Sequence, residues 1–123
     1  MNPDTLLETD RLRLRRFTDT DADARLLLDL DSDPEVTRYL SPHGGGVLLP
    51  DAAAYRERIR SIWLPYYAHP ARGVFAAEDR ATGEFLGWFM LRRATDYTFA
   101  KEAGWDRDGD LDLGYRLRRA AWG

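Results

Sequence analysis

The chain has 123 residues, of which 44% are hydrophobic and 32% charged, and its net charge is −3. These values are typical of one soluble globular domain, residues 1–123, with a modest core. The negative charge argues against general nucleic-acid binding, and the lack of cysteine excludes disulfides, thiolate metal sites and a cysteine-bound acyl intermediate. No run is apolar enough to span a membrane and the start lacks a signal peptide, so we expect a cytoplasmic protein.

The first half of the chain predicts one strand followed by helices. Residues 11–17 (RLRLRRF) alternate, which predicts a strand whose leucines face inward and whose arginines 11, 13 and 15 face outward. Polar capping candidates in residues 18–23 predict a helix with Ala24, Leu27 and Leu28 on one face. Asp33 and Pro34 predict the start of a second, short helix, because aspartate caps helices well and proline fits their first turn.

The middle of the chain predicts one longer helix and a hairpin. After the start signal at Pro50-Asp51, apolar residues fall at helical spacing as far as Leu64, where Pro65 should interrupt the helix. Residues 73–79 and 84–91 then read as two strands joined by a glycine-containing loop. Trp88 and Phe89 lie on opposite faces of the second strand, so we expect one to face the core and the other to line a pocket.

Two loops resemble known motifs without matching them. Residues 43–46 (HGGG) can form an oxyanion hole in lipase-like hydrolases, but no serine here stands in a Gly-x-Ser-x-Gly turn, so we interpret the glycines as a flexible loop. Residues 106–110 (DRDGD) fail the spacing of a calcium loop and predict a tight turn at Asp108-Gly109. With two histidines and no cysteine, no metal site is expected.

The end of the chain carries the clearest functional signal. Apolar and polar residues alternate over 111–118, which predicts a last strand with one buried face. This strand runs into an arginine-rich stretch and reaches Gly123, where a phosphate-binding loop is expected to begin.

Three segments in order resemble the GNAT N-acetyltransferases, especially their ribosomal-protein-alanine N-acetyltransferase branch. Residues 112–123 (DLGYRLRRAAWG) resemble its central strand and opening loop, residues 7–15 (LETDRLRLR) its first strand, and residues 33–40 (DPEVTRYL) the segment after its first helix. The resemblance implies an α/β (α+β) fold with a mostly antiparallel sheet and flanking helices. In the family a helix, more strands and a further helix follow the glycine-rich loop, so we expect a partial domain whose C-terminal half is missing.

The resemblance also implies a reaction and a set of residues. Acetyl-CoA would be the co-substrate, and a primary amine of a protein N-terminus or a small molecule would accept the acetyl group. The backbone around Arg116 and Leu117 would face the acetyl and pantetheine groups, and the pyrophosphate end would lie at Arg118, Arg119 and Gly123.

The acceptor side rests on four further residues. Asp112 stands where family members often carry a glutamate that helps to deprotonate the amine, although a solvent-facing structural carboxylate explains the same residue equally well. Tyr39 and His43 fall in a region that borders the acceptor site in the family, and Trp88 is a further candidate for substrate contact.

Two functions therefore remain open. The first is an acetyl-CoA-dependent N-acetyltransferase. The second is a non-catalytic GNAT-like fragment or interaction module, which self-associates through the exposed edge of the last strand or pairs with a complementing chain.

Overall fold

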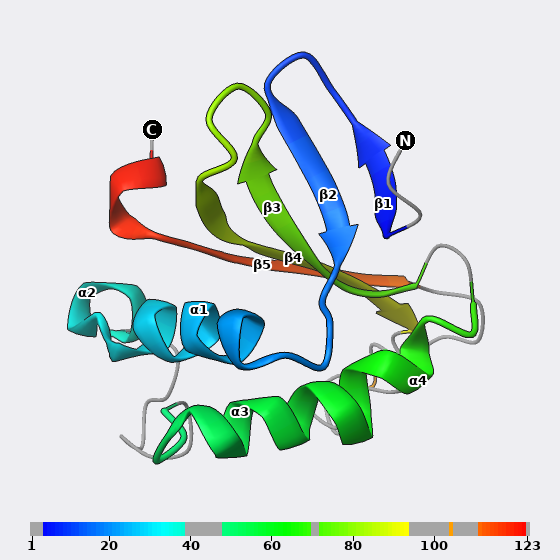
Figure 1. Cartoon of the computed structure of the whole chain (residues 1–123). Helices are drawn as coiled ribbons and strands as arrows, with labels where there is room; N and C mark the ends of the chain where they lie inside the picture. Colours follow the sequence, from blue (N-terminus) through cyan, green and yellow to red (C-terminus); the bar gives the residue numbers. More distant parts are fainter. Residues whose placement is uncertain (1–3, 39–47, 70–71, 94–103, 105–110, 123) are drawn as a thin grey trace.

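A five-stranded antiparallel sheet with helices against one face forms the fold (Figure 1). The computed structural model describes residues 4–38, 48–69, 72–93, 104 and 111–122. The strands follow one another in space in the order of the chain: β1 (Thr5–Glu8), β2 (Leu12–Arg16), β3 (Gly73–Asp79), β4 (Phe85–Arg93) and β5 (Leu111–Leu117). This confirms the α/β fold with a mostly antiparallel sheet and flanking helices.

The N-terminal segment forms a hairpin of two strands rather than one. β1 pairs with β2, and the turn between them is closed by the Thr9 hydroxyl, which accepts a hydrogen bond from the Leu12 N–H at 3.0 Å. The predicted outward orientation is wrong for Arg15. This residue lies opposite the core residue Ala76 and pairs with Asp23 of the first helix, so it faces the helices. The neighbouring carboxylate compensates for the buried charge.

The two N-terminal helices begin where the capping residues predict. In α1 (Asp21–Ser32) the Thr20 hydroxyl accepts from the Asp23 N–H at 3.2 Å. In α2 (Pro34–Thr37) the Asp33 carboxylate accepts from the Glu35 N–H at 2.9 Å. These bonds satisfy N–H groups that a helix start leaves without a partner.

The third helical segment continues past the expected stop. α3 (Ala52–Arg58) passes through a π-helical turn (Ile59–Trp63) into α4 (Leu64–Tyr66). The prediction that Pro65 interrupts the helix near Leu64 is wrong, because Pro65 lies in the first turn of α4. The π turn changes the hydrogen-bond pattern just before it, and a proline lacking an N–H is tolerated there.

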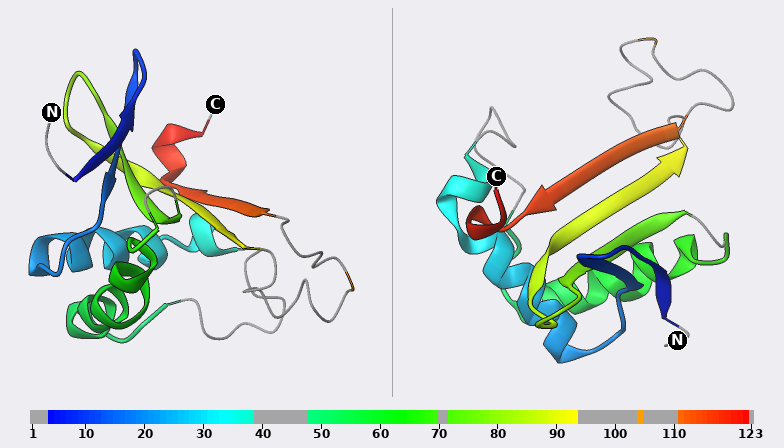
Figure 2. Two further views of the ribbon diagram at one scale, coloured as in Figure 1. Left: turned by 90° about the vertical axis from the view of Figure 1, so that its right-hand side faces the viewer. Right: turned by 90° about the horizontal axis from the view of Figure 1, so that it is seen from above.

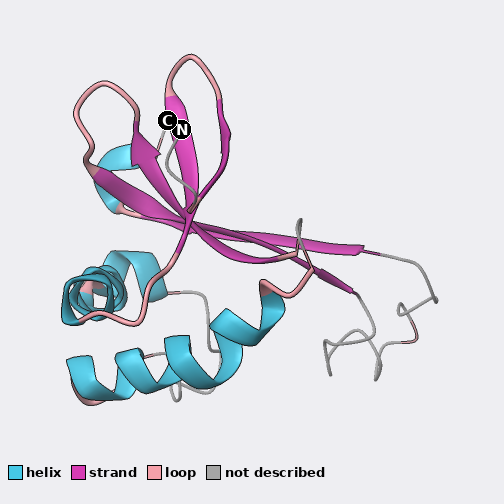
Figure 3. Cartoon of the chain, turned by 45° about the vertical axis from the view of Figure 1, so that its right-hand side comes forward, coloured by secondary structure: helices cyan, strands magenta, loops and turns pink. Residues whose placement is uncertain are grey.

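The core lies between the sheet and these helices (Figure 3). The Phe17 ring is its centre and packs 5.1 Å from Trp63 and 6.2 Å from Phe85, measured between ring centroids. The largest fully buried side chains are Tyr55, Phe17, Leu27 and Ile59. We call the sheet face that contacts the helices the helix-side face and the opposite one the open face.

The orientation of β5 differs from the expectation. Its apolar side chains lie on the open face, where Leu113 is 70% exposed and Tyr115 66%, so the predicted buried apolar face is wrong. Its polar side chains instead lie on the helix-side face, because Asp112 and Arg116 find partners of opposite charge there. Among the described strands, β5 is an edge strand beside β4 (Figure 2).

Candidate functional site

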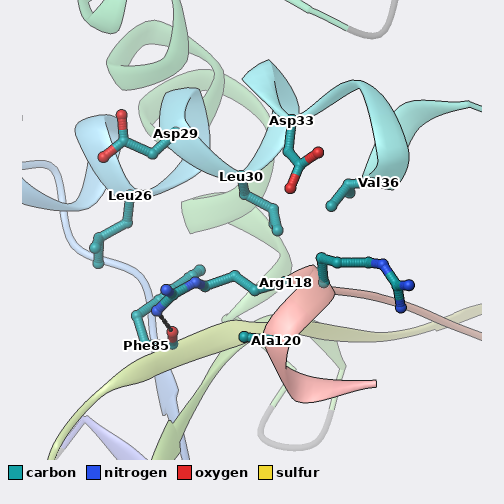
Figure 4. A pocket seen from close by; sticks show the side chains of 9 residues that line it. Leu26, Asp29, Leu30, Asp33, Val36, Phe85, Arg118 and Ala120 are labelled. Atoms are coloured by element: carbon teal, nitrogen blue, oxygen red, sulfur yellow. Dashed lines mark hydrogen bonds between the residues drawn. The ribbon is translucent and has the colours of Figure 1, made fainter. Parts of the chain in front are cut away.

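A pocket of about 620 Å³ opens at the carboxyl end of β5. Its apolar wall consists of Leu26, Leu30, Val36 and Phe85. Asp29 and Asp33 lie at the α1 side and Arg118 lies at the sheet side (Figure 4). The pocket therefore combines an apolar wall with charges of both signs.

Arg118 is anchored at this pocket. Its Nη1 donates to the backbone oxygen of Phe85 at 2.9 Å and to Glu84 Oε1 at 2.8 Å. Both bonds use the same nitrogen, and a guanidinium carries five N–H donors. Within the described part of the chain, these are the only hydrogen bonds of the Arg118 side chain, which leaves other donors for a ligand.

Arg119 lines the same pocket from a short 3₁₀ turn, Arg119–Ala121. Its guanidinium lies 4.7 Å from the centre of the Trp122 ring, and the Trp122 indole N–H donates to the backbone oxygen of Leu117 at 3.0 Å. The segment after β5 thus folds back on the end of the strand. Two predicted cofactor-binding arginines are brought together in one place.

The backbone at Arg116 and Leu117 is held tightly against β4. Leu117 pairs with Gly87, where φ is +145°, and a Cβ on that glycine would lie 2.1 Å from the Arg116 carbonyl oxygen. Only glycine allows so close an approach. The Arg116 side chain faces the helices, whereas Leu117 lines a second pocket on the open face.

Asp31 is a buried carboxylate that the sequence interpretation missed. Its Oδ1 accepts from Arg116 Nη1 at 2.7 Å, and its Oδ2 accepts from the Tyr55 hydroxyl at 2.8 Å. Burial raises the pKa of Tyr55 to about 12, and the Asp31 carboxylate acts in the same direction. The signal in the sequence is an aspartate four residues after Leu27, on the apolar face of α1.

Asp112 lies on the helix-side face, well away from the arginine pocket. It stands directly opposite Arg92, whose Nε is 3.1 Å from Asp112 Oδ2. Arg118 lies six positions after Asp112, which corresponds to about 20 Å along an extended strand. The predicted base and the predicted phosphate-binding end therefore lie toward opposite ends of β5.

Comparison with protein families decides the identity of the domain. The family model described as "Acetyltransferase (GNAT) domain" matches residues 11–123. The chain belongs to the GNAT acetyltransferase family. A search of curated proteins gives no match.

GNAT domains use acetyl-CoA as co-substrate, and the residues of this GNAT chain fit such a molecule. Arg118 and Arg119 supply cations suited to phosphates beside an apolar wall. The strand leading away from them is held in place by β4 at Gly87. A charged end and a preorganised backbone are what a phosphate-bearing thioester requires.

Among the remaining predicted residues of the GNAT domain, Trp88 is described by the structure and does not line the pocket. Trp88 packs on the helix-side face, 6.4 Å from the Trp63 ring and 5.1 Å from the Arg116 guanidinium, whereas Phe89 lines the pocket on the open face. The substrate contact of Trp88 stays a prediction. Tyr39, His43 and Gly123 lie outside the described residues.

The described residues of the GNAT domain contain no group of three or more histidine, cysteine or acidic side chains placed to hold a metal ion. Among the same residues, every helix is too short or too polar to cross a membrane.

Proposed function

We propose that this chain binds acetyl-CoA along β5 and transfers the acetyl group to a primary amine of a protein N-terminus or a small molecule. One observation carries the proposal. A single strand joins a pocket with two arginines, Arg118 and Arg119, to a carboxylate about 20 Å away, Asp112. The membership of the chain in the GNAT family supports the same assignment.

At the pocket end, the two arginines hold the pyrophosphate. Arginine suits this task because its planar guanidinium donates in pairs to phosphate oxygens. Arg118 approaches from the sheet and Arg119 from the 3₁₀ turn, so the phosphates are contacted from two elements. The backbone of the glycine loop expected at Gly123 adds further N–H donors.

At the carboxyl end of β5, the backbone of Arg116 and Leu117 faces the acetyl and pantetheine groups. When the acceptor amine attacks the thioester carbon, a C–N bond forms, the C–S bond breaks and negative charge develops on the carbonyl oxygen. Backbone N–H groups in a fixed position stabilise that charge. The sulfur leaves as a thiolate and takes one proton from solvent water.

Asp112 accepts, through water, the proton that the amine loses, because it lies four residues before Arg116, about 13 Å along an extended strand. Its Oδ2 is held by Arg92, so Oδ1 is the oxygen that takes the proton. A correctly placed base contributes roughly 10²- to 10⁴-fold to such a step.

A second function follows from the exposure of β5. Leu113 and Tyr115 are exposed on the open face, and β5 is an edge strand among the described strands. An unpaired edge with apolar side chains favours pairing with another chain. In this reading the domain is a non-catalytic interaction module that self-associates through β5 or pairs with a complementing chain.

Calorimetric titration of acetyl-CoA into the purified chain tests the first function. We expect saturable binding that the double variant Arg118→Ala/Arg119→Ala weakens at least tenfold. The control Arg25→Ala/Arg60→Ala removes the same charge from exposed sites on α1 and the π turn, and should bind as the wild type does. No binding at millimolar ligand would contradict the proposal, and so would equal weakening in the two double variants.

A cytoplasmic location, the ribosomal-protein-alanine branch and the acceptor contacts of Tyr39, His43 and Trp88 stay predictions from the sequence. Once turnover is observed, comparing the acetylation rates of N-terminal peptides and of small amines distinguishes a protein acceptor from a small-molecule acceptor.

A further inference from the structure

Asp31 is a buried carboxylate for which the proposed transfer has no use. Its side chain is 3% exposed, and it lies near the end of α1. One carboxylate oxygen accepts from Arg116 and the other from Tyr55, at 2.7 and 2.8 Å. Asp31 therefore connects α1 to β5 on one side and to α3 on the other.

Arg116 completes this connection from the sheet. It stands 85 residues along the chain from Asp31. Its guanidinium lies 5.1 Å from the centre of the Trp88 ring. Its Nε is buried and has no hydrogen-bond partner among the described residues. One ion pair and one aromatic ring thus determine where the guanidinium lies.

Stability alone is a poor explanation for this ion pair. Removing two charges from water is costly, and apolar side chains of similar size in the same place are often as stabilising or more so. A buried ion pair does specify one arrangement, because each charge left without its partner is strongly unfavourable. Here the arrangement specified is the position of β5 relative to α1.

The backbone next to Arg116 is held from the sheet as well. The Arg116 carbonyl oxygen lies so close to Gly87 that a Cβ there would come within 2.1 Å of it. The Arg118 N–H donates to the backbone oxygen of Leu86 at 2.8 Å. Residues 116–118 are therefore restrained by β4 through the backbone and by α1 through the Arg116 side chain.

We propose that Asp31 is a positioning residue for the donor site, and that Tyr55 orients its carboxylate. The inference rests on the proposed function, in which the backbone of Arg116 and Leu117 receives the acetyl and pantetheine groups. Backbone donors stabilise developing charge best when they need no rearrangement. By fixing Arg116, Asp31 keeps that backbone in place before the donor arrives.

Binding of coenzyme A to Asp31→Asn, measured by calorimetry, is the first part of the test. Asparagine keeps the shape of the side chain but removes the charge that holds Arg116. We expect at least tenfold weaker binding. The matched control is Asp23→Asn. Asp23 lies on the same helix as Asp31 but away from β5, and the substitution breaks its similar buried ion pair with Arg15 of β2. It should bind within twofold of the wild type.

Tyr55→Phe is the second variant and keeps the proposal testable where Asp31→Asn fails to fold. It preserves the ion pair and removes the hydrogen bond to Asp31, together with the bond that the Tyr55 oxygen accepts from the Leu49 N–H. Binding about threefold weaker than that of the wild type is expected. Binding by folded Asp31→Asn or Tyr55→Phe that equals the wild type would overturn the positioning role.

Amide hydrogen exchange without ligand separates this proposal from the proposed function. Asp31→Asn should speed exchange of the Arg118 amide at least tenfold more than exchange of the Arg80 amide, which is bonded to Arg11 in a distant turn. Asp23→Asn should not. Equal acceleration at both amides would show a merely structural role. If the wild type binds no coenzyme A while this exchange pattern holds, the proposed function fails and the restraint of β5 by Asp31 stands.

Discussion

Arg15 and Asp23 form a bidentate ion pair that joins β2 to α1. Arg15 Nη1 and Nη2 each donate to one carboxylate oxygen of Asp23 at 2.9 Å. The Thr18 N–H and hydroxyl also donate to this carboxylate, at 2.8 and 2.9 Å. Asp23 is thus the meeting point of a strand, the following turn and a helix.

Removal of the Asp23 carboxylate should destabilise the fold. We expect Asp23→Ala to lower the free energy of unfolding by about 3 kcal/mol, the lower end for a broken buried ion pair, because Arg15 loses this partner but keeps Glu78 at 3.1 Å. Urea unfolding followed by circular dichroism measures the change. The exposed pair of Asp21 with Arg25 is the control, and Asp21→Ala should cost no more than about 1 kcal/mol. Equal losses in the two variants would contradict this prediction.

Stability should also fall in acid because of Asp23. Burial opposes its ionisation, but hydrogen bonds from Arg15 and Thr18 outweigh burial and lower its pKa below the ordinary value of 3.8. A carboxylate with a lowered pKa stabilises the fold above its unfolded pKa, and this contribution is lost as the pH falls through the folded pKa. Unfolding free energies measured from pH 6 to pH 2 should therefore decrease less steeply in Asp23→Asn than in the wild type.

Gly87→Ala should disrupt the contact between β4 and β5. The new Cβ would meet the backbone of Arg116 at 2.1 Å, and φ of +145° is unfavourable for alanine. We expect a loss of about 3 kcal/mol or more, the combined cost of backbone strain and steric overlap.

The control for Gly87 is Gly83→Ala. Gly83 also has a positive φ, +76°, but no atom would lie within 4 Å of its Cβ. A loss of about 1–2 kcal/mol is expected there from the left-handed conformation alone. Thermal and urea unfolding of both variants give the comparison, and a smaller loss at Gly87 than at Gly83 would show that β5 does not press against β4 as described.

Asp112→Asn should impair acetyl transfer without impairing donor binding. The loss of a general base predicts a decrease in kcat of roughly 10²-fold or more. The Kd for coenzyme A, measured by calorimetry, should stay within twofold, because Asp112 lies about 20 Å from the arginine pocket. An unchanged kcat in Asp112→Asn would contradict the role of Asp112 as a base and would leave it as a structural partner of Arg92.

Leu113→Lys tests self-association through β5. Leu113 is exposed on the open face, and a lysine there disfavours the pairing of apolar edges. If the wild type associates at high concentration, sedimentation velocity should show a shift of Leu113→Lys toward the monomer. Ile62→Lys places the same charge at an exposed apolar residue of the π turn and should leave the association unchanged. A wild type that stays monomeric at high concentration would contradict the association itself.

Much of the secondary structure could be predicted because its signals are local. Thr20, Asp33 and Asp51 cap helices as their residue types suggest, and the predicted strand 73–79 coincides with β3. The continuation of the helix through Pro65 could not be predicted, because it depends on a π turn in the residues before it. Arg118 and Arg119 could be predicted as pocket residues because residues 112–123 resemble the central strand and opening loop of the GNAT family, and these two arginines directly follow that strand.

The sequence by itself determined the family, the order of the elements apart from the separate strand β1, and the alternation of β2 and β5. Only the tertiary structure decided which face of each strand meets the helices. A period of two separates the faces of a strand but does not say which one is buried. In β2 and β5 the helix-side face is the one whose arginines meet a carboxylate of α1, Arg15 with Asp23 and Arg116 with Asp31. Arg116 and Asp31 are 85 residues apart, so their pairing leaves no local pattern in the sequence.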